Sequence, residues 1–291
     1  MKSPKILLLL SFLCSIGLVK AQSPISGFMQ NKGNGSLVIS QNYEYYDEVY
    51  LVPKKVNGVP VFNNVTIRST SFYGTYGITD KLNLVVNLPY VSAEGSASPQ
   101  VLKNLNFENK REGLQDVSAY LKYNAYSCTV ADGTLNLVGA LGIQTPVGNY
   151  KVNEGLQSIL AIGNRATSIN AMAVALYKNN SGFFTSGQVG YNVKNGEVPN
   201  ALVSEFKVGL ANNYYVDAYI ANQVSMGGTD ILAEGFQGFF PSTKVNATRV
   251  GVNAFVPVYG GFGLSGGGSV YIDGRNLGKS TSIYGSAIFS F

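Results

Sequence analysis

The sequence ends with Thr-Ser-Ile-Tyr-Gly-Ser-Ala-Ile-Phe-Ser-Phe, residues 281–291, and this stretch alternates strictly along its length. One set of side chains is apolar or small: Ile283, Gly285, Ala287, Phe289 and Phe291. The other set is mostly polar: Ser282, Tyr284, Ser286, Ile288 and Ser290. Because the side chains of a strand point alternately to its two faces, this period of two predicts a β-strand with one apolar face.

Similar alternating runs recur through the rest of the chain. In one of them, Leu135, Leu137 and Leu141 share a face, and Asn136 and Gln144 lie on the other. Counting back from the C-terminus gives twelve runs, at residues 36–48, 63–77, 82–92, 113–126, 134–146, 165–178, 182–193, 200–211, 213–225, 245–257, 261–272 and 280–291. Ten or fourteen strands stay open as alternatives, because residues 147–165 and 225–244 are ambiguous.

The connections between these runs alternate between short and long. The short ones are residues 78–81, 127–133, 179–181, 212 and 258–260, and the long ones are 50–62, 93–111, 147–165, 194–199, 225–244 and 273–279. Tight turns at one rim and long loops at the other are typical of a membrane barrel, with both chain ends on the turn side. A soluble β-sandwich is the alternative, but it gives no reason for this alternation. We therefore predict an all-β fold, a transmembrane antiparallel β-barrel of about 12 strands.

The N-terminus has the pattern of a secretory signal. Lys2 and Lys5 precede an apolar run at residues 6–19, and Lys20 and Ala21 follow it. A charged start, a short apolar run and a small-residue cleavage site indicate a cleaved signal peptide. Leu13 stands before Cys14 where a lipoprotein signal has a small residue, so we do not expect lipidation. The predicted domains are a signal peptide at residues 1–21 and an outer-membrane β-barrel domain at residues 22–291.

Three segments resemble a known family. They are residues 72–91, with Gly-Ile-Thr-Asp and Leu-Pro-Tyr-Val; residues 113–123, with Gly-Leu-Gln-Asp-Val and Leu-Lys-Tyr; and residues 141–150, with Thr-Pro-Val-Gly-Asn-Tyr. Together they are similar to the outer-membrane β-barrel transporter family of the meta-pathway of phenol degradation. Gln115 stands where that family usually has Gly, and Val147 interrupts its usual Pro-Thr-Gly. The resemblance covers residues 72–150.

The resemblance implies a location and a function. It implies a channel in the bacterial cell outer membrane, surrounded by lipid, for the passive passage of small hydrophobic or aromatic molecules. It also implies that the barrel-insertion machinery recognises the C-terminal Phe291. The alternative is a non-conducting structural or interaction barrel of the same membrane.

Composition excludes several other classes of function. Removing Lys2, Lys5 and Lys20, and no acid, changes the formal charge from +5 to +2, so a nucleic-acid partner is not indicated. The chain has no His, which excludes Ser-His-Asp catalysis and His-ligated metals. Gly263, Ser265 and Gly267 match a hydrolase motif, but they lie in a predicted strand and have no His partner. We expect no enzyme, no cofactor and no metal.

Charged residues on the predicted inner faces are candidates for lining the lumen. They are Arg68, Asp116, Lys122, Glu205, Lys207, Asp217 and Arg249. Buried charges must pair or stay hydrated. Two interpretations stay open and are compatible: an ion-pair network that braces the wall, and a polar path or binding site for a solute.

One long connection is unusually apolar. Residues 227–243 contain Phe236, Phe239 and Phe240 directly before Pro241. An exposed apolar patch commonly marks a contact with a ligand or partner. This loop is therefore a candidate entrance to the barrel, and packing against other loops or lipid headgroups is the alternative.

Overall fold

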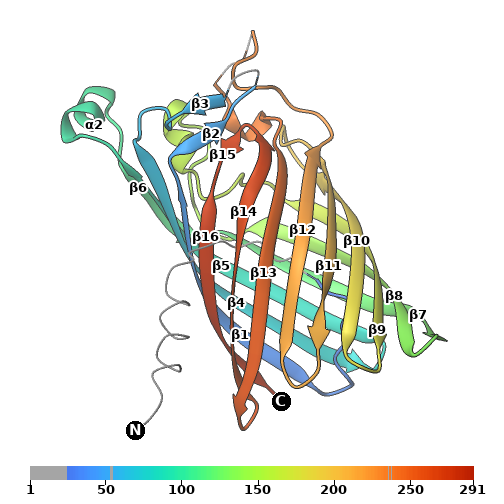
Figure 1. Ribbon diagram of the computed structural model, residues 1–291. Coiled ribbons are helices and arrows are strands. Elements are labelled where there is room, and N and C mark those ends of the chain that lie inside the picture. Colours follow the sequence, from blue (N-terminus) through green and yellow to red (C-terminus); the bar gives the residue numbers. More distant parts are fainter. Residues whose placement is uncertain (1–24, 53–54, 235, 237) are drawn as a thin grey trace, which may run out of the picture.

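The computed structural model describes residues 25–52, 55–234, 236 and 238–291, and it shows a closed antiparallel barrel of 12 wall strands (Figure 1). The predicted signal peptide lies outside the described residues. Strands β6 and β7 follow one another within a single wall strand, because both pair with β5 and only Gln115 separates them. In ring order the wall consists of β1 (Gly35–Tyr46), β4 (Asn64–Thr79), β5 (Leu82–Ser96), β6 (Lys110–Leu114) with β7 (Asp116–Val130), β8 (Gly133–Pro146), β9 (Ser168–Asn179), β10 (Phe183–Lys194), β11 (Ala201–Ala211), β12 (Tyr215–Ser225), β13 (Asn246–Tyr259), β14 (Phe262–Arg275) and β16 (Thr281–Ser290).

The C-terminal strand closes the barrel. Strand β16 pairs with β14 on one side and with β1 on the other, so the last wall strand meets the first. The seam extends to the end of the chain, because Gly35 N donates to Phe291 O at 2.9 Å and Phe291 N donates to Gly35 O at 3.0 Å. Phe289 packs against Phe262, with ring centroids 4.8 Å apart. The predicted strand at residues 281–291 and the predicted fold class are confirmed.

The outer face of the wall is apolar. In β9, Ile169 is 62% exposed, whereas its neighbour Asn170 is 1% exposed and points inward. Leu141 and Phe206 are exposed on the same outer face of their strands. Apolar side chains outside and polar side chains inside are the reverse of a soluble fold and match a barrel surrounded by lipid.

The two rims of the barrel differ as the sequence predicts. At the turn rim, wall strands are joined by tight connections, and the wall begins at Gly35 and ends at Phe291 (Figure 1). Gly260 and Gly261 form one of these turns with φ of 57° and 85°, a left-handed pair that suits a two-residue hairpin. The opposite rim, which we call the loop rim, carries the long connections.

The long connections hold the remaining elements. These are a small sheet of β2 (Glu48–Tyr50), β3 (Lys55–Asn57) and β15 (Leu277–Gly278), the helix α2 (Pro99–Leu105), and the 3-10 helices η2 (Gly155–Leu160) and η3 (Phe240–Ser242). Within the described ranges, none of the helices has the length and apolar character needed to cross a membrane. The described parts of residues 147–165 and 225–244 add no wall strand, so the number is twelve and not fourteen.

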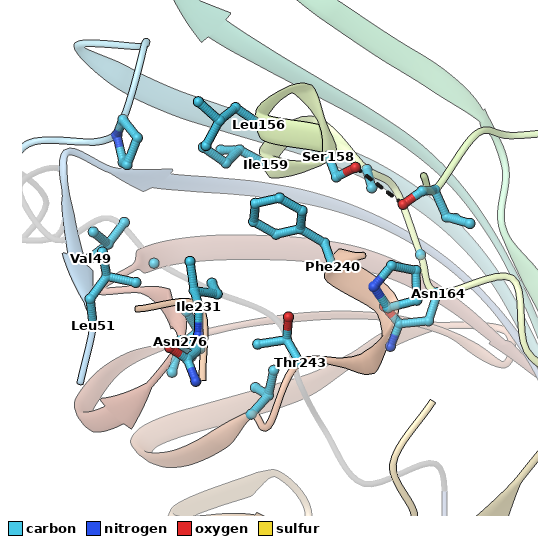
Figure 2. A pocket seen from close by; sticks show the side chains of 18 of the residues that line it. Val49, Leu51, Leu156, Ser158, Ile159, Asn164, Ile231, Phe240, Thr243 and Asn276 are labelled. Carbon is cyan, nitrogen blue, oxygen red and sulfur yellow. Dashed lines mark hydrogen bonds between the residues drawn. The ribbon is translucent and has the colours of Figure 1, made fainter. Parts of the chain in front are cut away.

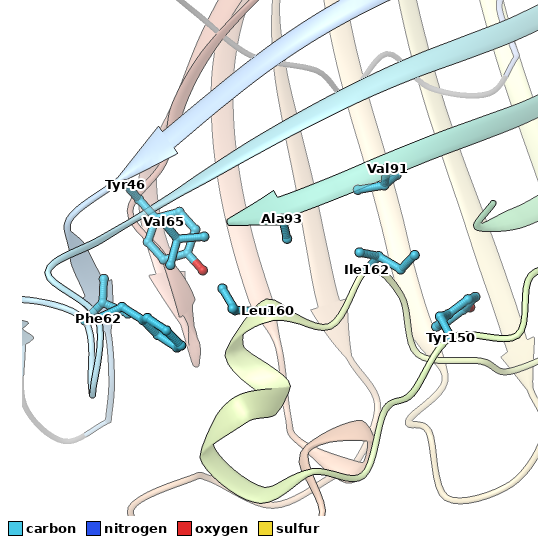
Figure 3. Packing of buried hydrophobic residues seen from close by; sticks show 9 residues of the cluster. Tyr46, Phe62, Val65, Val91, Ala93, Tyr150, Leu160 and Ile162 are labelled. Carbon is cyan, nitrogen blue, oxygen red and sulfur yellow. The ribbon is translucent and has the colours of Figure 1, made fainter. Parts of the chain in front are cut away.

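Two groups of buried apolar side chains occupy the interior. The first lies at the loop rim, where Leu160 and Ile162 pack against Val65, Val91 and Ala93 of the wall (Figure 3). The second lies closer to the turn rim and is made of Ile25, Val85, Tyr120, Val138, Ala140, Met172 and Val174. Polar and charged side chains line the lumen between these groups, where the candidate site is found.

Candidate functional site

Six of the seven charged residues singled out in the sequence lie inside the barrel. Asp116, Lys122, Glu205, Asp217 and Arg249 are buried, and the Lys207 side chain is 13% exposed. They come from β7, β11, β12 and β13, where they occupy inward-facing positions and their neighbours along the strand are half-buried or exposed.

The prediction that Arg68 lines the lumen is wrong. Its side chain is 60% exposed and lies 3.6 Å from Glu94, and its guanidinium lies 5.9 Å from the centre of the Tyr43 ring. The inward-facing residues of this part of β4 are Ser69 and Ser71, which have the opposite parity. Arg68 stands on the outer face near the loop rim, where water or headgroups can solvate a cation.

Charges gather in one part of the lumen, which we call the central cluster: Glu205, Lys207, Asp217, Tyr219 and Arg249. Lys207 Nζ lies 3.0 Å from Glu205 Oε1 and 5.5 Å from the centre of the Tyr219 ring. The Arg249 guanidinium lies 6.0 Å from the centre of the same ring. The register pairs Lys207 with Tyr219, so these side chains share the inner face. Cations that lie beside a carboxylate and an aromatic ring stabilise this part of the barrel wall.

Asp116 and Lys122 stand apart from the central cluster. Asp116 accepts hydrogen bonds from Gln144 Nε2 at 2.9 Å and from the Tyr150 hydroxyl. Lys122 contacts backbone carbonyl groups of the N-terminal segment. The charges therefore form separate groups, each with its own partners, and not a single network.

Three cavities follow one another from the loop rim toward the turn rim. The mouth cavity has about 240 Å³ and lies between the loops; the middle cavity has about 310 Å³; the inner cavity has about 390 Å³. Val245 and Leu277 line both the mouth and the middle cavity, so these two are neighbours. Glu205 lines the middle cavity and its partner Lys207 the inner one. The central cluster therefore lies between the two lower cavities.

The mouth cavity is mostly apolar and is built by several loops. Val49 and Leu51 line one side, Leu156 and Ile159 of the η2 segment another, and Phe240 lies between them (Figure 2). Ile231 and Leu277 complete the apolar lining. The middle cavity has a more polar lining that includes Gln144, Gln188, Asn192, Asn222 and Gln223.

The loop that carries the three predicted phenylalanines is tied down by an ion pair. Arg275 Nε and Nη2 donate to the two carboxylate oxygens of Asp230 at 2.7 Å and 2.5 Å, and Asn276 Nδ2 donates to Asp230 Oδ1 at 2.8 Å. The hydrogen bond from Arg275 is the main reason why the pKa of Asp230 falls from 3.8 to about 2. We call this contact the latch.

The three phenylalanines have different positions. Phe240 lines the mouth cavity, and Phe236 packs edge-on against it with ring centroids 5.5 Å apart. Phe239 is half-buried and directly precedes η3. Of the three phenylalanines, it is therefore Phe240 that lines the mouth cavity.

The segment around η2 folds into the loop rim and covers part of the opening. Arg111 Nε and Nη2 each donate to the Glu154 carboxylate at 2.9 Å, and this hydrogen bonding holds the pKa of Glu154 below its usual range. Burial, and then the hydrogen bond to Asp116, raise the pKa of Tyr150. Leu160, the last residue of η2, is fully buried.

The turn-rim half of the lumen contains residues 25–30, which we call the N-terminal plug. Lys122 Nζ donates to the carbonyl oxygens of Ser26 at 3.1 Å and Phe28 at 2.5 Å. Gln30 and Asn83 exchange two hydrogen bonds, of 2.7 and 2.9 Å. The Phe28 ring lies 5.2 Å from the Phe184 ring. Ile25 and Phe28 also line the inner cavity, so the plug narrows the lower lumen.

The plug is a structural element that sequence reasoning missed. Residues 25–30 have no period of two and lie between the predicted signal peptide and the first predicted strand. The available signal was the pair of apolar residues Ile25 and Phe28 in this segment. Their partners lie far along the chain, and 94 positions separate Lys122 from Phe28.

Solved structures are similar to this fold. An outer membrane channel from Pseudomonas putida F1 has a TM-score of 0.68 and 14% identity, over 94% of this chain and all of that one. The translocator domain of the autotransporter NalP from Neisseria meningitidis has a TM-score of 0.48 and 9% identity, covering 90% of this chain and 89% of that domain. A deletion mutant of TodX, a monoaromatic hydrocarbon channel, has a TM-score of 0.41 and 9% identity, covering 90% of each chain.

No protein-family model matches the sequence, and no curated protein matches it either. The similarity to the Pseudomonas channel extends over the whole barrel, although the sequences differ at most positions. The chain therefore has the fold of an outer-membrane β-barrel channel.

Proposed function

We propose that the protein is a channel of the bacterial outer membrane, through which small hydrophobic or aromatic molecules pass passively. The observation that carries the proposal is the series of three cavities along the lumen, with mainly apolar residues at the mouth and more polar and charged residues farther in. The fold, which is shared with an outer membrane channel, and the apolar outer face support the location. No step of such a passage requires bond-breaking chemistry.

The gradient of polarity gives the passage a physical basis. An apolar solute gains roughly 25 cal/mol for each Å² of apolar surface that leaves water, so the mouth cavity favours its capture. The lining of the middle cavity carries amide side chains, and the central cluster follows, so hydrogen-bonding and charged side chains become more frequent inward. Binding at the mouth therefore concentrates a solute without retaining it throughout the lumen.

Passage also requires the plug to move. Residues 25–30 occupy the turn-rim half of the lumen, and Lys122, Asn83 and Phe184 hold them there. Lys122 is the one charged contact among these, and its two partners are backbone carbonyl groups. The barrel wall keeps its strand pairing when the plug leaves, because no wall strand includes residues 25–30.

Occupation of both ends of the lumen favours a second candidate, a non-conducting barrel that serves structure or interaction. The η2 segment covers the loop rim and the plug fills part of the turn rim. In this case the arm made of β5, α2 and β6, which carries no buried residue in α2, would be the interaction surface.

Reconstitution of the purified full-length protein separates the two candidates. We expect lipid vesicles that contain the protein to take up an apolar solute faster than empty vesicles, and planar bilayers to show discrete conductance steps. The matched control is a vesicle with the same amount of heat-denatured protein. Uptake at the rate of empty vesicles, together with silent bilayers, would support the non-conducting barrel.

We further propose that Phe291 is the residue by which the insertion machinery recognises the chain. Phe291 is 52% exposed and its backbone completes the seam with Gly35. Its ring stacks on Phe289, with centroids 6.1 Å apart. An exposed aromatic side chain on the closing strand is accessible before the barrel closes.

A further inference from the structure

Side-chain amides are concentrated in the middle cavity. Five of its lining residues are Asn or Gln, against two in the mouth cavity and two in the inner cavity. Four of the five lie at inward-facing positions of β8, β10 and β12: Gln144, Gln188, Asn192 and Gln223. The wall therefore directs a group of amides into one part of the lumen.

The strand register places three of these amides around one point of the inner wall. Gly190 of β10 and Gln223 of β12 both pair with Val203 of β11. Gln188 and Asn192 lie two residues to either side of Gly190, so they share its inward face. The three amide side chains therefore surround Val203, which lines the same cavity.

Two of the amides keep their whole hydrogen-bonding capacity. Within the part of the chain that the structure describes, the side chains of Asn192 and Gln223 have no hydrogen-bond partner. Neither amide group is fully buried, so a molecule in the cavity can reach both. Gln188 Nε2 donates to Glu205 Oε1 at 3.4 Å, which leaves the carbonyl oxygen of Gln188 as an acceptor. The cavity wall therefore offers both donors and acceptors.

The charged side chains of the lining balance one another. Among the described residues that line the middle cavity, Glu205 and Arg249 are the charged ones, and they have opposite signs. Glu205 Oε1 lies 3.0 Å from Lys207 Nζ, and the Arg249 guanidinium lies 5.5 Å from the centre of the Tyr271 ring. An ionic ligand would have to leave water for counter-charges that already have partners in the wall. The lining therefore favours an uncharged polar ligand.

The size of the cavity limits the ligand to about one ring. A cavity of about 150 Å³ holds benzene, and a six-carbon sugar has about twice as many non-hydrogen atoms. The middle cavity, with about 310 Å³, can hold one such molecule. Met172 and Val203 give the lining a small apolar area beside the amides. This combination suits a ring with C–H groups on its faces and hydroxyl groups around its edge.

We infer that the middle cavity is a binding site for a compact, uncharged molecule with several hydroxyl groups, such as a monosaccharide or a cyclic polyol. Hydroxyl groups both donate and accept, so several of them around one ring can pair with Gln188, Asn192 and Gln223 at once. A hydrophobic solute would leave these amides unpaired, which costs free energy. The inference goes beyond the proposed function, because it adds a second class of solute and a site that does not depend on passage.

Titration with glucose tests the site. Saturation-transfer NMR measures binding to the full-length protein in lipid nanodiscs, with empty nanodiscs as the background. We expect saturable binding of glucose, and roughly three- to tenfold weaker binding of glucuronate, which has nearly the same shape and a carboxylate. Asn192→Leu and Gln223→Leu each remove one amide at nearly constant size and should each weaken glucose binding roughly three- to tenfold. Asn87→Leu, in the lining of the inner cavity, is the matched control and should bind glucose like the wild type.

A cavity-filling variant tests the location of the site independently. Ala221 pairs with Glu205 and lines the middle cavity, so Ala221→Phe should reduce glucose binding to the background of empty nanodiscs. Resistance to unfolding in detergent, seen as a heat-dependent shift on a gel, shows that each variant is folded. Absence of saturable binding to the folded wild type, or undiminished binding to both folded leucine variants, would overturn the inference.

The binding test is separable from the test of passage. Vesicle uptake of an apolar solute by a protein that does not bind glucose would overturn the site and leave the channel function in place. Glucose binding by a protein that neither conducts nor takes up solute would do the reverse. Equal binding of glucose and glucuronate would overturn the preference for an uncharged ligand.

Discussion

The two ends of the lumen are narrowed by different physical means. At the loop rim, folded loops meet through an apolar surface and through ion pairs, Arg111 with Glu154 and Arg275 with Asp230, that are partly open to water. At the turn rim, the plug is held by the buried Lys122, which donates to two backbone carbonyl groups. Salt acts on exposed ion pairs far more than on a buried amine paired with uncharged groups. The difference indicates an outer end that responds to ionic strength and an inner end that responds mainly to what enters the lumen.

The orientation of the barrel in the membrane should give the largest effect, because a cysteine at either rim is accessible from only one side of the membrane. In a Cys128→Ser background, Asn104→Cys in α2 lies at the loop rim and Asn180→Cys lies in a turn-rim connection, both exposed. We expect an impermeant thiol reagent to label the first and not the second on intact cells. Labelling of Asn180→Cys alone would show the opposite orientation, with the turn rim at the cell surface.

Assembly should depend on the turn rim and not on the loop rim. Deleting Phe291 removes two backbone hydrogen bonds of the seam and the terminal aromatic ring, and should leave little folded, heat-modifiable barrel. Replacing residues 99–105 of α2, none of which is buried, by a short Gly-Ser linker should leave the yield unchanged. Equal yields from both variants would remove the role proposed for the terminus.

Removal of the plug should raise conductance several-fold. Replacing residues 25–30 with a Gly-Ser stretch of the same length removes the side chains of Ile25 and Phe28 from the inner cavity. Lys122→Met is an intermediate case: hydrogen bonds to a charged group are worth about 1.5–3 kcal/mol, or roughly 10- to 100-fold in the opening equilibrium. Planar bilayer recordings measure both variants. Conductance no higher than wild type in the Gly-Ser variant would show that the plug does not limit the passage.

Loss of the latch should give the smallest effect. A partly exposed ion pair contributes about 0.2–1 kcal/mol, so Asp230→Asn should accelerate proteolysis of its loop by at most about fivefold at neutral pH. Because the pKa of Asp230 is lowered to about 2, the wild-type latch is intact above pH 3.8 and is lost as the pH falls through about 2. The variant should lack this acid dependence. Arg275→Lys keeps the charge but not the two-point contact, and should be intermediate.

The wall could be predicted from the sequence because its strands obey a local rule. A period of two assigns each side chain to a face, and the boundaries of β9, β11 and β16 agree with the expected runs within a few residues. The same rule failed for Arg68, where polar residues occupy both faces of β4 near the loop rim. Alternation of hydrophobicity disappears where the outer face leaves the lipid, so parity there carries little information.

The contents of the lumen could not be predicted for a different reason. The plug, the η2 segment and the latch have no periodic pattern, and their contacts join residues distant in sequence, such as Arg111 with Glu154 and Asp230 with Arg275. Glu205, Lys207, Asp217 and Arg249 were found because they belong to wall strands.

A reversible lock on the plug tests the central claim most directly. A Cβ built on Gly27 lies 2.5 Å from Leu176 Cβ, so Gly27→Cys with Leu176→Cys, in a Cys128→Ser background, needs a shift of about an ångström to reach the ~3.8 Å of a disulfide. Uptake of 2-naphthol by vesicles is measured with the lock oxidised and then reduced, beside each single-cysteine variant. We predict uptake near that of empty vesicles in the oxidised protein and recovery on reduction. Equal uptake in the two states, with the disulfide verified, would contradict a passage through this lumen.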